Sequence, residues 1–382
     1  MRTTDDLKHL LIISFSDLAV DARVNRQIRL LRNHYRVTAV GYADPSVAGV
    51  EFVGISRGAR STAGKAVAAA MLKAGLYERF YWSSTAVIAA ERKLREKPFD
   101  LILANDVNTL PLALSLGAKH GVVLDAHEYS PREMEDDWRW RFFFQRYFGY
   151  LCERYVPRVS GMITVCAGIA REYKRNFGVC ASVVHNAPNL TALSPRTTAE
   201  GAVRLVHHGG ATRSRKLENM IAMMAYLDKR FALDFYLLPT DVRYLQRLRR
   251  MAAGDARIRF LAPVPTEQLP KVMNSYDVGL YILEPNSFNN RHALPNKFFD
   301  FIQGRIAVAI GPSPEMARLV QQHNIGLVAQ DLTPRSMATE LSGLTSTQLD
   351  HYKRQADAAA RILCYENSSQ GLLQVLSAAI RG

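Results

Sequence analysis

The sequence of 382 residues lacks the features that mark several large classes of protein. No stretch approaches 18 consecutive apolar residues, so no membrane-spanning helix is expected. The N-terminus has neither the long apolar region nor the small-residue cleavage site of a signal peptide, which predicts a cytoplasmic protein. The four cysteines, Cys152, Cys166, Cys180 and Cys364, show no C-x-x-C spacing, so we expect reduced, buried thiols rather than disulfides or zinc ligands.

Several ligand-binding motifs are missing as well. There is no Walker A motif, and no G-x-G-x-x-G follows the first predicted strand, which weighs against a simple NAD enzyme or a kinase. No D-x-D pair lies at the end of a predicted strand, so a Mg²⁺ site has no evident ligands and we expect no metal or other cofactor. No zinc finger, RRM-like or helix-turn-helix signature occurs, so no nucleic-acid partner is expected.

What the chain does have is positive charge, with a net charge of +14. This charge suits an anionic membrane surface or a phosphorylated substrate, or it serves solubility alone. The segment 138–155 packs Trp, Phe and Tyr among arginines and has two interpretations: a helix lying in a membrane interface on the cytoplasmic face, or a core helix whose arginines face water. The segment 64–82 has the same two interpretations.

Strands and helices alternate along the chain, and the alternation occurs twice. Polar, Pro-containing residues from 189 to 202 separate the two halves and indicate a linker. The pattern predicts an α/β protein with two Rossmann-like, doubly wound parallel sheets that face a cleft. Apolar runs predict strands at 9–15, 35–42, 50–56, 99–104, 121–125, 161–165, 182–185, 204–208, 232–238, 258–261, 276–283 and 305–310. Periodic segments predict helices at 25–33, 63–95 (broken near Gly75), 138–155, 167–176, 216–228, 241–253, 267–273 and from 295, with only helices after 310.

The segment H-A-L-P-N-K-F-F-D-F-I-Q-G, residues 292–304, lies between two of the predicted strands of the second half. Pro295 suits the first turn of a helix, which places Asn296, Lys297 and Asp300 at the N-terminus of that helix. Unpaired N–H groups and the charge of Lys297 suit a phosphate, and Asp300 suits a sugar hydroxyl. A capped helix with a surface lysine is the alternative interpretation.

A second candidate loop is H-H-G-G-A-T-R-S-R-K-L-E-N, residues 207–219. Gly209 and Gly210 let the backbone approach a ligand closely. Arg213, Arg215 and Lys216 follow them and lead into a helix. Two cations from separate loops, Arg215 and Lys297, can neutralise a leaving diphosphate.

With these two segments the chain resembles the GT-B glycosyltransferases, in particular the retaining family-4 type. The segments D-A-R-V-N-R-Q, D-A-H-E-Y-S-P, C-A-G-I-A-R-E-Y and V-V-H-N-A-P-N fit the same family. The resemblance implies an acceptor-binding domain at 1–188, the linker at 189–202, a nucleotide-sugar-binding domain at 203–364, and a last helix at 365–382 that packs back on the first domain. It also implies metal-independent transfer of a sugar, with retention, to a glycan or lipid-linked acceptor in surface polysaccharide synthesis.

The resemblance assigns roles to individual residues. Arg215 (or else Lys216 or Arg213) and Lys297 would hold the donor diphosphate, Asp300 the donor ribose, and His127 would act near the anomeric carbon; Gly209, Gly210, His292, Leu294 and Asn296 complete the donor site. Arg23, Asp106, Asp125 and Glu128 are candidates for the acceptor or for orienting His127.

The chain departs from the family at one of these positions. The family often has an acid where His292 stands, so the identity of the sugar stays open. The alternatives are a nucleotide-sugar 2-epimerase on the same fold and a non-catalytic nucleotide-sugar-binding partner.

Overall fold

The computed structural model describes residues 7–382, which form two compact units. Unit 1 comprises the chain up to Val184 together with Ser369–Gly382, and unit 2 comprises His185–Ser368. The boundary thus lies at 184/185, whereas the sequence placed it at 188. None of the helices in this part of the chain is both long and apolar enough to cross a bilayer.

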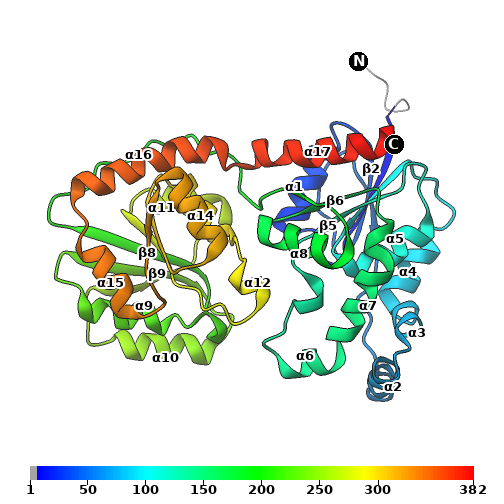
Figure 1. Ribbon diagram of the computed structural model, residues 1–382, viewed down its shortest axis with the longest axis horizontal. Coiled ribbons are helices and arrows are strands. Elements are labelled where there is room, and N and C mark those ends of the chain that lie inside the picture. The colour runs from blue at the N-terminus through cyan, green and yellow to red at the C-terminus, as the bar shows by residue number, and fades with distance from the viewer. Residues whose placement is uncertain (1–6) are drawn as a thin grey trace. The chain divides into compact units, whose positions relative to one another are not determined.

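Unit 1 is built on a sheet with helices around it (Figure 1). Its seven parallel strands have the order β3-β2-β1-β4-β5-β6-β7. Leu10 of β1 lies opposite Val37 of β2 on one side and Leu101 of β4 on the other. The central strands β1, β4 and β5 each consist of five buried residues. Such apolar runs are expected in a parallel sheet, because both of its faces are covered. The strands are β1 (His9–Ile13), β2 (Arg36–Gly41), β3 (Glu51–Gly54), β4 (Leu101–Asn105), β5 (Val122–Ala126), β6 (Gly161–Thr164) and β7 (Ser182–Val183).

Helices connect these strands, and several start at the caps that the sequence offers. Asp21 caps α1 by accepting from the N–H of Val24, and Ser61 caps α2 in the same way. The helix predicted at 138–155 is broken at Phe144 into two. The helices are α1 (Ala22–Leu31), α2 (Thr62–Lys73), α3 (Tyr77–Trp82), α4 (Thr85–Leu94), α5 (Leu110–Leu116), α6 (Trp138–Phe143), α7 (Gln145–Tyr155) and α8 (Ala167–Phe177).

Unit 2 repeats the architecture with a six-stranded parallel sheet of order β10-β9-β8-β11-β12-β13. The prediction that only helices follow 310 was wrong, because Gly326–Val328 adds an edge strand beside β12. The strands are β8 (Val203–Gly210), β9 (Phe231–Leu238), β10 (Ile258–Leu261), β11 (Val278–Tyr281), β12 (Ala307–Ile310) and β13 (Gly326–Val328). The helices are α9 (Glu218–Met223), α10 (Val242–Ala252), α11 (Leu269–Met273), α12 (Phe288–Arg291), α13 (Asn296–Gln303), α14 (Pro314–His323), α15 (Pro334–Ser342) and α16 (Ser346–Ile362).

The stretch expected as a linker, 189–202, has no helix or strand but is anchored to unit 2. Thr191 donates through its hydroxyl to the carbonyl of Gln303 at 2.8 Å, and the N–H of Thr198 donates to Asp350 at 2.8 Å. The last helix, α17 (Tyr365–Arg381), begins in unit 2, and from Ser369 onward it belongs to unit 1. There Leu372 and Leu376 join the core around β1.

Three of the four cysteines are buried as expected, but Cys180 is exposed. All four are free thiols.

Candidate active site

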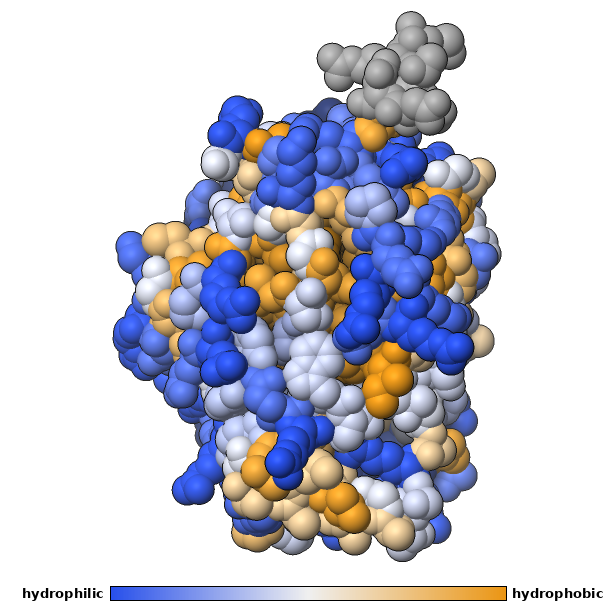
Figure 2. Space-filling model, turned by 90° about the vertical axis from the view of Figure 1, so that its right-hand side faces the viewer, coloured by the Kyte–Doolittle hydropathy of each residue, from blue (hydrophilic) through white to orange (hydrophobic). Residues whose placement is uncertain are grey.

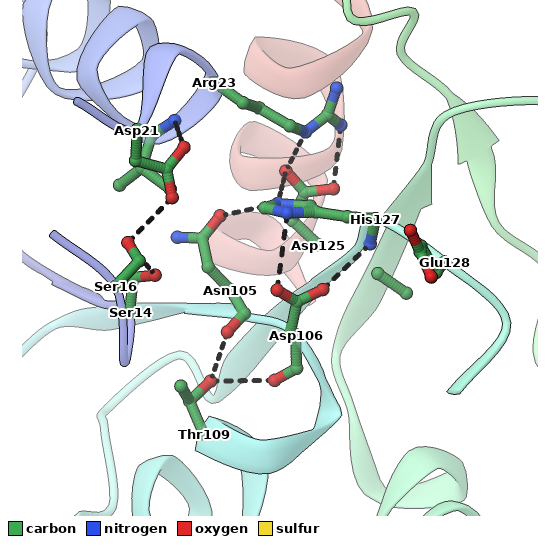
Figure 3. Close-up of polar contacts among 12 residues, drawn as sticks. Ser14, Ser16, Asp21, Arg23, Asn105, Asp106, Thr109, Asp125, His127 and Glu128 are labelled. Carbon is green, nitrogen blue, oxygen red and sulfur yellow. Dashed lines mark hydrogen bonds and ion pairs between the residues drawn. The ribbon is translucent and has the colours of Figure 1, made fainter. Parts of the chain in front are cut away.

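In unit 1, polar side chains gather at the carboxyl ends of β4 and β5, around the ring of His127 (Figure 3). His127 Nδ1 lies 3.4 Å from the carboxylate of Asp106, and its Nε2 lies 3.3 Å from Asp125 and 3.3 Å from the side-chain oxygen of Asn105. The N–H of His127 also donates to Asp106, at 3.1 Å. Neighbouring parallel strands end at the same edge of a sheet, which is why residues 105–106 and 125–127 meet here.

Asp125 is held in a buried ion pair with Arg23. The guanidinium donates through Nε and Nη2 to the two carboxylate oxygens at 2.7 and 2.8 Å, a bidentate pair. Its Nη1 donates to the carbonyl of Val184 at 2.9 Å, and Gln27 donates to Asp125 as well. Asp125 has no exposed surface, so the pair is shielded from solvent.

These carboxylates set the charge of His127. Burial opposes a charged ring, but Asp106 and Asp125 outweigh it and raise the pKa of His127 to about 9. Burial also opposes charge on Asp125, yet Arg23 and His127 hold the pKa of that carboxyl well below its usual range. At neutral pH the cluster therefore contains an imidazolium, which donates hydrogen bonds and does not act as a base.

The structure corrects where some of the predicted residues stand. Arg23 was expected in a loop, but it lies on α1 and is 5% exposed, with its guanidinium bound to Asp125. Asp125 lies in β5, in agreement with the strand predicted at 121–125, and β5 ends one residue later at Ala126. Glu128 stands apart from the His127 ring in Figure 3, and no drawn contact reaches its carboxylate. Asn105 and Gln27, which the fold brings to the cluster, were not predicted from the sequence.

In unit 2, two cations converge on Gly209, near the end of β8. A Cβ atom on Gly209 would lie 2.9 Å from Nζ of Lys297 and 3.4 Å from Nη1 of Arg215. Lys297 is 4% exposed and Arg215 is half-buried. Among residues 7–382, no carboxylate forms an ion pair with either cation.

The surroundings of Lys297 make its charge costly in the ligand-free protein. Burial first, and then the charge of Arg215, lower the pKa of Lys297 well below its usual value, whereas Asp300 opposes this shift. His207 donates from Nδ1 to the carbonyl of Leu280 at 2.8 Å, so its Nε2 lone pair faces Lys297 Nζ at 3.5 Å. A bound anion would offset the repulsion between the two cations.

The two histidines beside these cations are neutral. Burial and the charge of Lys297 lower the pKa of His207 well below its usual value, and the same causes, with Arg215, lower the pKa of His208 to about 3. His208 Nε2 lies 3.4 Å from the carboxylate of Asp300, which is 3% exposed. His207 and His208 directly precede Gly209 in the sequence, but no role was predicted for them.

The other predicted donor residues lie less centrally. Arg213 forms an ion pair with Asp241 at 2.8 Å, and Lys216 forms one with Glu284 at 3.4 Å. The helix predicted from 216 begins two residues later, at Glu218.

The loop before α13 contributes the remaining predicted donor residues. Asn296 is exposed as the first residue of α13, and Leu294, two residues earlier, is buried. His292 directly follows α12, a short helix that was not predicted from the sequence, and its Nδ1 lies 3.4 Å from the buried carboxylate of Glu315. Glu315, 23 positions further along the chain, was also missed.

Comparison with known proteins identifies the domain and the fold. Residues 28–191 match the family model of Glycosyltransferase Family 4. None of the curated protein sequences matches this chain.

Solved structures that resemble the chain include Anabaena Alr3699/HepE in complex with UDP and glucose, with a TM-score of 0.68 and 13% identity over 97% of this chain and 99% of that one. They also include sucrose-phosphate synthase from Thermosynechococcus elongatus, with a TM-score of 0.73 and 12% identity over 97% and 98%. WaaG, a glycosyltransferase involved in lipopolysaccharide biosynthesis, has a TM-score of 0.62 and 11% identity over 96% and 98%. The chain thus has the GT-B fold, and the part of it at residues 28–191 matches Glycosyltransferase Family 4.

Proposed function

We propose that this protein is a glycosyltransferase that moves a sugar, with retention, from a nucleoside-diphosphate donor to a hydroxyl of a glycan or a lipid-linked acceptor in the synthesis of a surface glycoconjugate. The observation that carries this proposal is the convergence of Lys297 and Arg215 on Gly209. Neither cation forms an ion pair with a carboxylate of residues 7–382, and Gly209 next to them has no Cβ. Together they form a site for a diphosphate.

The proposed chemistry follows from these charges. The bond between the anomeric carbon and the β-phosphate oxygen breaks, and its electron pair stays on the diphosphate. Lys297 and Arg215 stabilise the charge that develops there. The acceptor oxygen bonds to the anomeric carbon on the same face, and its proton passes to a phosphate oxygen of the leaving group. Because two cations supply the positive charge, we propose that the reaction needs no metal.

The remaining residues are assigned by their chemistry. Asp300, whose carboxylate faces the neutral His208, suits a ribose hydroxyl. In unit 1 the imidazolium of His127 suits a sugar hydroxyl that accepts a hydrogen bond, and Asp106 suits one that donates. The solved structures of HepE with UDP and with UDP-glucose support UDP as the first nucleotide to test. The likeness to WaaG, which is involved in lipopolysaccharide biosynthesis, supports an acceptor on a surface glycoconjugate.

The substitution Lys297→Met tests the diphosphate site. Met has a side chain of similar length but no charge, and burial and Arg215 disfavour the charge of Lys297 in the folded state. Without nucleotide, the variant should therefore have a melting temperature no lower than that of the wild type. The thermal shift caused by UDP or GDP should be lost, and transfer should fall by about 10²–10³-fold. The matched control is Lys271→Met, which removes an exposed lysine on α11 of the same unit.

The possible results separate the proposal from its alternatives. A wild-type protein that is stabilised by neither nucleotide, or a Lys297→Met variant with unchanged activity, would contradict the diphosphate site. Conversion of the free donor without an acceptor would favour the epimerase. Nucleotide binding without turnover of any donor would favour the non-catalytic partner. Loss of transfer in EDTA would contradict the metal-free mechanism.

A further inference from the structure

Unit 1 contains an apolar cavity of about 590 Å³ outside the His127 cluster. Its walls come from α2, α3, α4, α6, α7 and the loops that follow β1, β2 and β3, and most of its lining is aliphatic or aromatic. Leu72, Phe80, Val87, Phe144 and Tyr147 are representative of this lining. A volume of this size is typical of a site for a small organic ligand, and an apolar lining favours an apolar group.

Three cations line the same cavity. The guanidinium of Arg57 lies 4.8 Å above the ring of Tyr42, and that of Arg60 lies 4.9 Å above the ring of Phe80. Lys65 on α2 is the third. Within residues 7–382 none of the three forms an ion pair, so their charges are available to an anionic group.

The cavity also has polar features that suit hydroxyl groups. The side-chain oxygen of Asn108 is buried and has no hydrogen-bond donor among the residues that the structure describes. A second cavity of about 600 Å³ shares Arg57 with the first and is lined by Ser16 and Asp21, whose oxygens can accept from hydroxyls. One connected region therefore offers apolar walls, unpaired cations and hydrogen-bond acceptors.

The outer surface beside the cavity is apolar and basic. Val67 on α2 and Trp138 and Phe142 on α6 are between 53% and 62% exposed. Nζ of Lys73 lies 2.7 Å from the centre of the Phe142 ring, which joins the two helices at the surface. Figure 2 faces the side of unit 1 that carries α2 to α5, and apolar side chains gather across its middle and at its lower end, where α2 lies in Figure 1. Such a surface suits the edge of a lipid layer.

We propose that the cavity binds the hydrocarbon chain of the acceptor, and that Arg57, Arg60 and Lys65 bind a phosphate or diphosphate attached to that chain. The acceptor class is thus an anionic isoprenoid-phosphate lipid. This inference rests on the proposed function, because it names the acceptor of the same transfer. Its evidence is separate, since none of the residues of the nucleotide site lines the cavity.

Farnesyl diphosphate is a soluble probe that combines both parts of this ligand. In isothermal titration calorimetry below its micelle concentration, it should bind at least tenfold more tightly than inorganic pyrophosphate or farnesol alone. Ala69→Trp fills the cavity and Arg60→Gln removes a cation that lines it, so each should weaken binding at least tenfold. UDP binding should be unchanged in both, because the proposed UDP site lies in unit 2. Thermal unfolding without ligand, followed by circular dichroism, would show whether unit 1 of each variant is folded.

Two variants serve as matched controls. Ala63→Trp places the same ring on the exposed side of α2, away from the cavity lining. Arg249→Gln removes an arginine from unit 2 that lies 5.9 Å above the ring of Phe260. Both controls should bind farnesyl diphosphate as the wild type does.

Four results would overturn the inference. Ala69→Trp could bind farnesyl diphosphate as tightly as the wild type does, or the wild type could bind pyrophosphate as tightly as farnesyl diphosphate. The wild type could bind UDP but not farnesyl diphosphate, or it could bind only phosphatidylglycerol vesicles that contain no isoprenoid. Binding of farnesyl diphosphate without binding of any nucleotide would instead support the cavity and overturn the proposed donor site.

Discussion

At the scale of single residues, Gly209 is a position where a substitution would disturb both the backbone and the cations of the proposed donor site. Its φ angle of +126° is one that residues with a side chain rarely adopt. An added Cβ would also meet Lys297 at 2.9 Å. Backbone strain and the displacement of a cation therefore act at the same point.

We expect Gly209→Ala to weaken UDP binding at least tenfold, measured by isothermal titration calorimetry. The control is Gly254→Ala in the same unit, because a Cβ there would have no neighbour within 4 Å and the φ angle is not positive. Equal UDP affinity in the Gly209→Ala variant would show that neither Lys297 nor Arg215 contacts the nucleotide.

His127 gives a prediction about pH. Its pKa rises from the ordinary 6.5 to about 9 in the folded protein, so the charged ring stabilises the fold. This contribution is complete below pH 6.5 and is lost as pH rises through 9. The free energy of unfolding of the wild type relative to His127→Asn should therefore decline by about 1.4 kcal/mol per pH unit across this range.

Urea denaturation at pH 6, 7.5 and 9 would measure the decline. His120→Asn is the control, because His120 is a half-buried residue of the same unit whose ring contacts the ammonium group of Lys8 and not the His127 cluster. A difference between wild type and His127→Asn that stays constant over the range would contradict an imidazolium in the cluster.

The residues of the site were only partly predictable from the sequence. Lys297 and Asp300 could be placed because a proline and an apolar pattern mark the helix that carries them. The sequence could not decide among Arg213, Arg215 and Lys216, because the decision depends on partners distant in the chain. Asp241 pairs with Arg213 and Glu284 pairs with Lys216, which leaves Arg215 beside Gly209. No local pattern links His292 to Glu315.

At the scale of elements, long buried runs were predictable and short or interrupted elements were not. The strand predicted at 99–104 is present as β4, Leu101–Asn105, and all five of its residues are buried. Gly326–Val328 was missed, since three residues starting with glycine carry no periodic signal. The break at Phe144 was missed too, because neither glycine nor proline marks it.

Helix α17 provides a prediction at this scale. Leu376 is fully buried in the core of unit 1, so Leu376→Ala should lower the free energy of unfolding by about 2–5 kcal/mol. Gln374→Ala, at an exposed position of the same helix, should change it by less than about 0.5 kcal/mol. Chemical denaturation monitored by circular dichroism would measure both, and equal stabilities would mean that the helix does not complete the core.

At the scale of the whole molecule, the repeated alternation of strands and helices was enough to predict two α/β units, because each parallel crossover needs a helix. The apolar cavity of unit 1 could not be predicted. Its lining extends from Phe15 to Tyr147, and its apolar members are of the same residue types as those of a filled core. The packing of α2, α3, α4, α6 and α7 decides that this space stays open.

The course of α17 has a consequence for biosynthesis. Unit 1 needs residues 369–382, which the ribosome makes only after all of unit 2. Unit 2 is continuous in sequence, from 185 to 368, and can fold as soon as it has emerged. We therefore expect the half that is translated first to reach its native state last, with the strands of its sheet exposed to chaperones in the interval.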